Sequence, residues 1–234
     1  MPTHCGFGST TALRLACLEI LLVVNGHEPA PQLLRRLSKR GGTSGIGVNT
    51  YFDGGLIVDL GIKSNGRTLV PSSISEADPI APTRLLRAEL PDWPAGIVVP
   101  ASAEPLSEAQ EQQFFTGVQP ASQSDVERIL YHAVFGVAAA VLEGDQTTFA
   151  SAVAALQECI WKRREIALYG TSVHHERSEL VELGATAVAM SSLGPGLFFL
   201  SDDPGAIAAH RLDIGAASIA AEVTFRNAGR IREW

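Results

Sequence analysis

The spacing of apolar residues predicts a helix near the start of the chain. From Thr10 onward, apolar residues recur at intervals of three or four positions, and Asn25-Gly26 then interrupts the pattern. A shorter helix is expected over 31–38, because Pro31 suits a first helical turn and leucines follow on one side. The first helix is expected to bury one face, made of Leu13, Ala16, Cys17, Ile20, Leu21 and Val24.

The next segment indicates short strands. Glycines separate two strand-like runs, 48–52 and 56–60, which predict a hairpin that follows a glycine-rich loop. Residues 62–94 are rich in Pro, Ser and Asp, which indicates a long excursion. Another strand is expected over 96–99, where the pattern becomes apolar again.

The second half of the chain mixes helical and strand patterns. Helices are expected over 107–115, 124–142, 147–160, 177–184 and 204–211. Strand patterns occur in AVAM (187–190), LFFL (197–200) and IAAEVTFRNAG (219–229). Helices and strands in this mixed order, with hairpins, predict an α+β sandwich rather than a doubly wound parallel sheet.

Composition limits the classes of function. With 234 residues, 46% of them hydrophobic, the chain can bury a substantial core. Its net charge of -7 and its scattered basic residues argue against nucleic acid as a partner. Its longest apolar runs are too short to cross a bilayer, so no membrane partner is expected. Cys5, Cys17 and Cys159 lack metal-ligand spacing, which predicts reduced thiols and a cytoplasmic location.

A small, hydroxyl-rich loop before the first helix predicts an anion site. Gly6, Gly8, Ser9, Thr10 and Thr11 place backbone N–H groups and hydroxyls at the positive end of the helix dipole. An ordinary Ser/Thr helix cap is the alternative interpretation. The spacing fits neither the Walker loop, which needs a lysine after its second glycine, nor the G-x-G-x-x-G fingerprint.

Two further glycine clusters strengthen the case for a phosphorylated ligand. The segment GGTSGIG (41–47) holds four glycines in seven positions, a density that lets backbone approach a ligand closely. The segment SSLGPG (191–196) lies between two strand patterns. Three such loops in one chain favour a small phosphorylated substrate.

These motifs carry a resemblance to a known superfamily. PTHCGFGSTTALRLA (2–16) resembles the second motif of the GHMP small-molecule kinases, and GATAVAMSSLGPGLFFL (184–200) resembles their third motif. RGGTSGIGVNTYFDGGLIVDLG (40–61) is similar to one branch, the β-ribofuranosylaminobenzene 5'-phosphate synthases. Glu111 with Phe114-Phe115, and Lys162-Arg163 with Glu165, extend the resemblance over nearly the whole chain.

The resemblance implies a fold and a domain division. It predicts a GHMP-type two-layer sandwich, with residues 1–94 as the remainder of an N-terminal domain related to a ribosomal protein and residues 95–234 as a ferredoxin-like C-terminal domain. Family members carry a sizeable segment before the first loop. We therefore expect a fragment, a misassigned start or a reduced relative, with sheet edges and apolar helix faces left uncovered.

The resemblance also implies an activity. The branch joins phosphoribosyl pyrophosphate to an aromatic acid, with loss of carbon dioxide and pyrophosphate, in methanopterin-type or C-nucleoside-type biosynthesis. An ATP-dependent small-molecule kinase is the alternative, but Gly47 stands where many such kinases carry an aspartate that acts on the substrate hydroxyl. An inactive truncated remnant is a second alternative, and a homodimer is expected for the active form.

The resemblance to this branch implies binding roles for individual residues. It names no catalytic side chain. Asp53 and Asp59 are the candidate ligands of Mg²⁺, although the strand pattern favours structural roles for each, in a turn or at a sheet edge. ATP is expected as a ligand only if the chain is a kinase. His4 also suits a structural cap, and Lys162 with Arg163 suits a solvated face. The phosphate-binding residues are expected to be Gly6, Gly8, Ser9, Thr10, Thr11, Ser191, Ser192, Gly194 and Gly196, and the substrate-binding residues His4, Ser44, Gly45, Gly47, Lys162 and Arg163.

Overall fold

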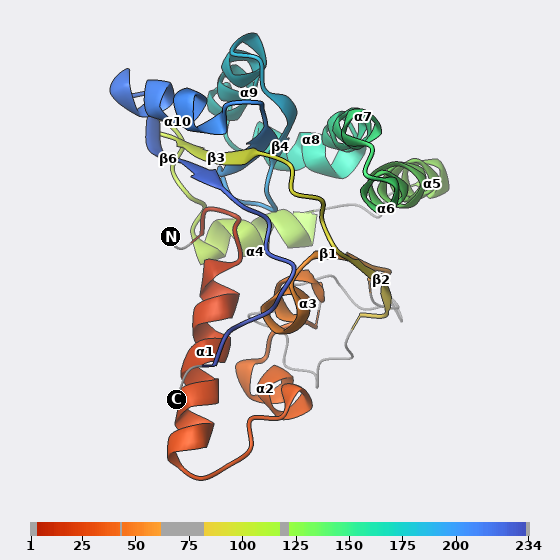
Figure 1. The fold of residues 1–234 in the computed structure, drawn as a ribbon, viewed down its shortest axis with the longest axis vertical. Coiled ribbons are helices and arrows are strands. Elements are labelled where there is room, and N and C mark those ends of the chain that lie inside the picture. Colours follow the sequence, from red (N-terminus) through yellow and green to blue (C-terminus); the bar gives the residue numbers. More distant parts are fainter. Residues whose placement is uncertain (1–3, 43, 62–81, 118–121, 233–234) are drawn as a thin grey trace.

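Four antiparallel strands form the larger sheet in the computed structural model, which describes residues 4–42, 44–61, 82–117 and 122–232 (Figure 1). Their order across the sheet is β4-β5-β3-β6, and α10 (Pro204–Asp213) connects β5 to β6. This is the strand order of a ferredoxin-like domain, as the sequence predicted. The strands are β3 (Ala95–Pro100), β4 (Thr186–Met190), β5 (Leu197–Leu200) and β6 (Ala217–Val223).

Helices cover this sheet and complete its core. Helix α9 (Ser172–Glu182) packs against β4 and β3, and α10 packs against β3 and β6. Helix α7 (Gln146–Gln157) also packs against β4, and its Phe149 ring lies 5.0 Å from the ring of Trp93. All six residues of β3 are buried, which explains why the sequence of this strand is continuously apolar.

The helices of the β3–β4 connection follow the predicted pattern with two differences. The helix predicted over 124–142 is a single run of α5 (Gln123–Leu130), a π-helical segment η1 (Tyr131–Ala138) and α6 (Ala139–Glu143). The helix predicted over 147–160 is α7, which ends at Gln157, and a separate helix, α8 (Ile160–Ala167), begins where the prediction ended. Helix α4 (Glu108–Gly117) lies between the C-terminal helices and the N-terminal part of the chain (Figure 1).

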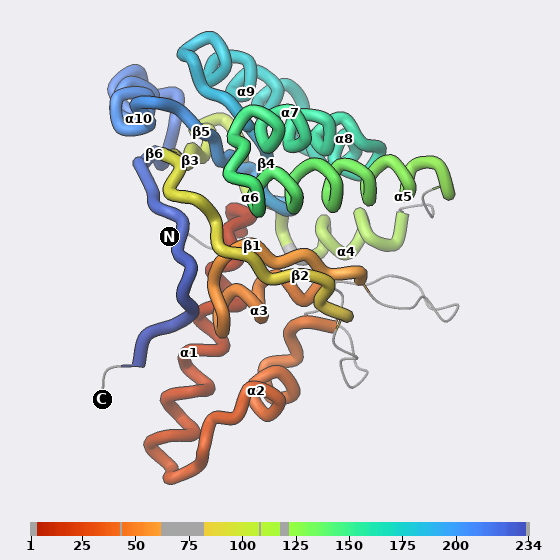
Figure 2. Tube along the Cα trace, turned by 45° about the vertical axis from the view of Figure 1, so that its right-hand side comes forward, coloured from red at the N-terminus to blue at the C-terminus, as the bar shows by residue number. Residues whose placement is uncertain are grey.

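The N-terminal part pairs a small sheet with three helices around a separate core. Leu15, Leu34 and Val48 form the fully buried centre of this core, one from each helix. The antiparallel strands β1 and β2 lie beside α3 (Figure 2). The elements are α1 (Ser9–Val24), α2 (Pro31–Ser38), α3 (Ile46–Asp53), β1 (Leu56–Asp59) and β2 (Arg84–Ala88).

Two sequence predictions for this part are wrong. Residues 48–52 were expected to be a strand, but they lie in α3, because burial of Val48 between α1 and α2 outweighs the β-propensity of the run. The interval 62–94 was expected to be an excursion, but β2 lies within it and pairs with β1; residues 62–81 lie outside the described part of the chain.

The buried face predicted for α1 is also wrong. Leu13 is 61% exposed and Val24 is 77% exposed, and Cys17, Ile20 and Leu21 are exposed with them. The helix instead buries Leu15 and Glu19 and packs Leu18 and Leu22 against the core that it shares with α2 and α3. Apolar residues cover most of the circumference of α1, so their spacing alone does not select the face that is buried.

The C-terminal segment ties the two parts together. After β6 the chain runs down beside the N-terminal helices (Figure 2). The N–H of Gly55 donates to the carbonyl of Arg226 at 2.8 Å, and the N–H of Arg230 donates to the carbonyl of Tyr51 at 2.8 Å. Asn227 exchanges two hydrogen bonds with the backbone of Leu90. Among the described residues, no helix is both long and apolar enough to span a membrane.

Candidate functional site

The loop that precedes α1 presents its backbone to the start of the helix. His4, Gly6 and Gly8 all have left-handed backbone conformations, with φ of 62°, 89° and 71°. Gly8, which has no side chain, is the N-cap of α1. A glycine rather than a serine or threonine occupies the N-cap position, so this position offers backbone and no hydroxyl to the positive end of the helix dipole.

The third glycine loop packs directly on this first loop. The N–H of Gly196 donates to the carbonyl of Cys5 at 3.1 Å, and the Ser191 hydroxyl donates to the carbonyl of Gly6 at 2.9 Å. A Cβ on Gly6 would lie 1.9 Å from the carbonyl oxygen of Ser191, and a Cβ on Gly194 would lie 2.0 Å from the backbone of Gly6. The glycines of both loops are thus required for contact between two backbones.

Two side chains hold the third loop in place. Lys162 on α8 donates to the carbonyl of Ser192 at 2.9 Å and forms an ion pair with Glu165. The buried hydroxyl of Tyr169 donates to the carbonyl of Leu193. Burial raises the pKa of Tyr169, and the nearby carboxylate of Glu111 raises it further, so this phenol stays a donor. The sequence analysis missed Tyr169, because a single tyrosine between helices carries no motif.

The second glycine loop reaches the same place from α3. A Cβ on Gly47 would lie 3.5 Å from the methyl carbon of Thr11 in the first turn of α1. The N–H of Gly45 donates to a carboxylate oxygen of Asp59 at 2.9 Å, and the Ser44 hydroxyl accepts the N–H of Ile46 at 3.3 Å. All three predicted loops therefore meet at the N-terminal end of α1. Thr43, which belongs to the second loop, lies outside the described residues.

His4 and Glu111 lie beside the first loop. The Nδ1 atom of His4 is 4.0 Å from a carboxylate oxygen of Glu111 on α4. Helix α4 thus places a carboxylate next to the first glycine loop, where it also raises the pKa of Tyr169. Of the two predicted basic residues, Lys162 points toward the third loop, and Arg163 is exposed.

The two candidate metal ligands are already engaged by protein groups. One carboxylate oxygen of Asp59 accepts the N–H of Gly45 and the other accepts the N–H of Gly61, both at 2.9 Å. Asp53 forms an ion pair with Arg84. Among the residues that the structure describes, no three His, Cys, Asp or Glu side chains gather as a metal would require. This pair of carboxylates does not fit a magnesium site, and Mg²⁺ stays a prediction from the resemblance.

Asp59→Asn tests whether this carboxylate supports the loop or binds a metal. The amide keeps one acceptor oxygen, so one of the two backbone N–H groups loses its partner, and we expect a loss of about 1–2 kcal/mol in the free energy of unfolding. Asp53→Asn is the matched control: its partner Arg84 is exposed, and we expect a loss below about 1 kcal/mol. Urea unfolding measures both. Unchanged stability of Asp59→Asn, together with loss of Mg²⁺ binding, would contradict the structural role.

Comparisons with known proteins agree with the motifs. A β-ribofuranosylphenol 5'-phosphate synthase from Methanothermobacter thermautotrophicus is 34% identical over 210 residues, which cover 88% of this chain and 63% of that protein. The synthase of the same name from Archaeoglobus fulgidus is 32% identical over 200 residues, which cover 85% of this chain and 61% of that protein. No family model matches the chain.

Solved structures agree on the fold. A homoserine kinase from Cytophaga hutchinsonii superimposes with a TM-score of 0.66 at 16% identity, over 98% of this chain and 69% of that one. A Listeria monocytogenes protein assigned as a homoserine kinase gives a TM-score of 0.63, also at 16% identity, over 98% of this chain and 70% of that one. At such identities the likeness concerns the fold alone.

The fold of the chain is therefore of the GHMP kinase type. The sequence of the chain is similar to those of the β-ribofuranosylphenol 5'-phosphate synthases, which agrees with the resemblance read from the loop sequences. The chain spans 63% and 61% of the length of the two relatives described above.

Proposed function

We propose that the chain takes part in a ribosyl transfer in which phosphoribosyl pyrophosphate condenses with an aromatic acid. The observation that carries this proposal is the similarity, over 88% of the chain, to a β-ribofuranosylphenol 5'-phosphate synthase. The structure supports it because three glycine loops, which could hold a pyrophosphate, meet at the start of α1.

The proposed reaction needs binding and charge stabilisation rather than an attacking side chain. The ring carbon that bears the carboxylate forms a bond to C1 of the ribose, while pyrophosphate leaves with the electron pair of its bond to that carbon. The carboxylate then leaves as carbon dioxide and returns its bonding pair to the ring. Backbone N–H groups at the start of α1 and the helix dipole would stabilise the charge that develops on the pyrophosphate.

A phosphoryl-transferring kinase is the competing activity. It would need an acceptor for the proton of the substrate hydroxyl, and Gly47 provides no carboxylate at the position where many kinases of this superfamily carry one. Gly47 also lies against Thr11, so this position of α3 packs on the first loop. These observations favour the synthase, and ATP is expected to bind only if the kinase alternative holds.

Titration with phosphoribosyl pyrophosphate tests the proposal. With Mg²⁺ in the buffer, we expect the chain to bind this compound and not ATP. Thr10→Val keeps the shape of the side chain but removes a hydroxyl from the first turn of α1, and we expect binding to weaken about tenfold, or about 1.4 kcal/mol. Thr147→Val on α7 is the matched control, because Thr147 is exposed and lies on another helix.

Each outcome of the titration discriminates between the alternatives. Binding of ATP with no binding of phosphoribosyl pyrophosphate would support the kinase. Failure to bind either compound would support an inactive remnant, and the titration would then be repeated with a chain of the length of the relatives. A homodimer and a cytoplasmic location are further parts of the proposal; the cysteine content supports the location.

A further inference from the structure

A pocket lies between α4 and α8. It has a volume of about 550 Å³, which is within the usual range of about 300–1,000 Å³ for small-molecule sites. Leu106, Phe114 and Leu168 contribute apolar walls. A pocket with this lining favours a ligand with an apolar ring.

The polar side chains of the pocket favour a ligand with a negative charge. Arg164 lines it from the last turn of α8, and Gln110 and Gln113 line it from α4. None of the ion pairs formed by the described residues involves Arg164. In a chain with a net charge of -7, a guanidinium without a carboxylate partner is suited to pair with the carboxylate of a ligand.

The aromatic wall is held by its neighbours. The ring of Phe114 makes edge contacts with Phe115 at 5.8 Å and with Trp161 at 6.4 Å between ring centroids. These contacts fix the orientation of Phe114, which can then stack or make an edge contact with a planar ligand. The amides of Gln110 and Gln113 can exchange hydrogen bonds with a hydroxyl or amino group on the ligand.

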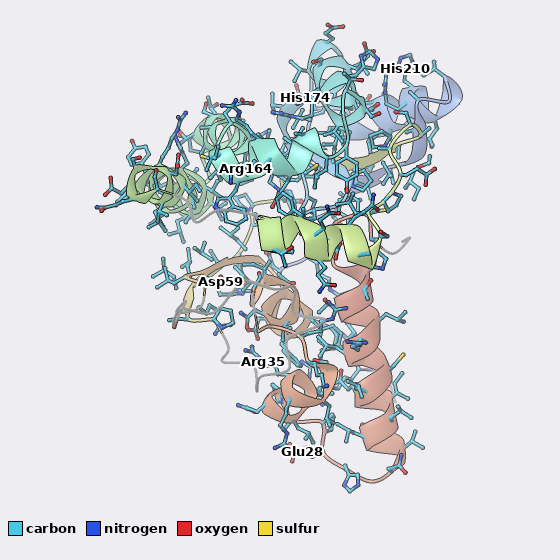
Figure 3. The ribbon with its side chains drawn as sticks, turned by 180° about the vertical axis from the view of Figure 1, so that it is seen from behind. Glu28, Arg35, Asp59, Arg164, His174 and His210 are labelled. Carbon is cyan, nitrogen blue, oxygen red and sulfur yellow. The ribbon has the colours of Figure 1, made fainter. Side chains whose placement is uncertain are left out.

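The two helices that form the pocket also form the glycine-loop site. Helix α4 carries Glu111, 4.0 Å from His4 of the first loop, and α8 carries Lys162, which donates to Ser192 of the third loop. Figure 3 shows Arg164 on α8, separated by α4 from Asp59 of the N-terminal part. Helices α4 and α8 therefore contact both the pocket and the glycine loops.

We propose that the pocket between α4 and α8 binds the aromatic carboxylic acid that accepts the ribosyl group, with Arg164 paired to its carboxylate and Phe114 against its ring. This assignment rests on the proposed function for the identity of the ligand. The pocket itself is defined by its own residues, and the sequence did not show that they lie together.

Binding of 4-hydroxybenzoate to the full chain tests the assignment. Calorimetric titration is expected to show binding to the wild type and at least about tenfold weaker binding to Arg164→Gln. Arg163→Gln is the matched control, because it makes the same change on the neighbouring exposed residue, outside the pocket, and should leave the affinity unchanged. The neutral analogue 4-hydroxybenzamide should bind the wild type and Arg164→Gln equally, which isolates the pairing of charges.

The results separate this proposal from the proposed function. Equal affinity of Arg164→Gln and wild type for 4-hydroxybenzoate, or no binding to the wild type at all, would overturn the pocket assignment. If the acid binds through Arg164 but phosphoribosyl pyrophosphate does not bind, the pocket assignment stands and the proposed ribosyl transfer fails. Phe114→Leu offers an independent check, since weaker binding of both the acid and the amide is expected when the ring contact is lost.

Discussion

Gly194→Ala is expected to lower the free energy of unfolding by about 3 kcal/mol and to abolish binding of phosphoribosyl pyrophosphate. The added Cβ would lie 2.0 Å from the carbonyl carbon of Cys5 and 2.0 Å from the amide nitrogen of Gly6. Both atoms belong to the backbone, so no flexible side chain can move to make room. The two loops would have to separate, and the surface that meets the pyrophosphate would be lost with them. Urea unfolding and titration of the folded fraction measure both effects.

Gly8→Ala is the control for this substitution. Gly8 has a φ of 71°, and no described atom lies within 4 Å of the Cβ that alanine would add. This variant adds only the strain of a left-handed backbone, about 1 kcal/mol. If Gly194→Ala unfolds at the same urea concentration as the wild type, the direct contact between the first and third loops is disproved.

Glu19→Gln is expected to lower the free energy of unfolding by about 3 kcal/mol. This value is at the lower end of the usual cost of breaking a buried ion pair, because the arginine partners of Glu19 are partly exposed. Glu19 is 2% exposed and lies on the buried face of α1. It accepts the hydroxyl of Tyr51 at 2.6 Å and a guanidinium hydrogen bond from Arg230 at 3.1 Å, and it pairs with Arg232. The substitution removes the charge that attaches the C-terminal segment to the N-terminal helices.

The matched control for Glu19→Gln is the same change at Glu28. This residue is exposed in the connection between α1 and α2 (Figure 3), and we expect a change below about 0.5 kcal/mol. Thermal unfolding at neutral pH compares the two variants. Equal stability of Glu19→Gln and Glu28→Gln would show that the Glu19 cluster does not hold the C-terminal segment.

The ion pairs of Glu19 also predict that the free energy of unfolding depends on pH. Burial raises its pKa, but hydrogen bonds from Arg230 and Tyr51 outweigh burial, and the net pKa in the folded chain is lowered. Protonation therefore favours the unfolded state, so the stability due to Glu19 is present above its unfolded pKa of about 4.3 and is lost as the pH falls through the folded value. The difference in stability between wild type and Glu19→Gln should shrink below about pH 4.

The sequence predicted most of the C-terminal sheet and its helices, because their local signals agree with their environment. The buried strand β3 is continuously apolar, and α10 begins with a proline in its first turn. The sequence did not predict α3, whose β-branched residues and glycines resemble a strand until Val48 is placed between α1 and α2. The buried face of α1 was also hidden, because its apolar residues surround most of the helix.

The candidate site was predicted in its parts but not in its arrangement. The three glycine loops were recognised from residue type and spacing, and the family resemblance was recognised from their sequences. The structure then showed why Gly6 and Gly194 are glycines: each fits against the backbone of the other loop. Tyr169 was not identified in this way, because it belongs to no motif, and the sequence did not show which residue of the basic run at 162–164 lines a pocket.

The sequence by itself determined the kind of fold, the loops and the relationship to a family of synthases, because these depend on local composition and on motifs that are continuous in the chain. Only the tertiary structure decided which face of α1 is buried, how Asp53 and Asp59 are engaged, and that a pocket forms between α4 and α8. These features depend on contacts between residues far apart in sequence, such as Glu19 with Arg230 and Gly6 with Ser191, and no local pattern encodes such contacts.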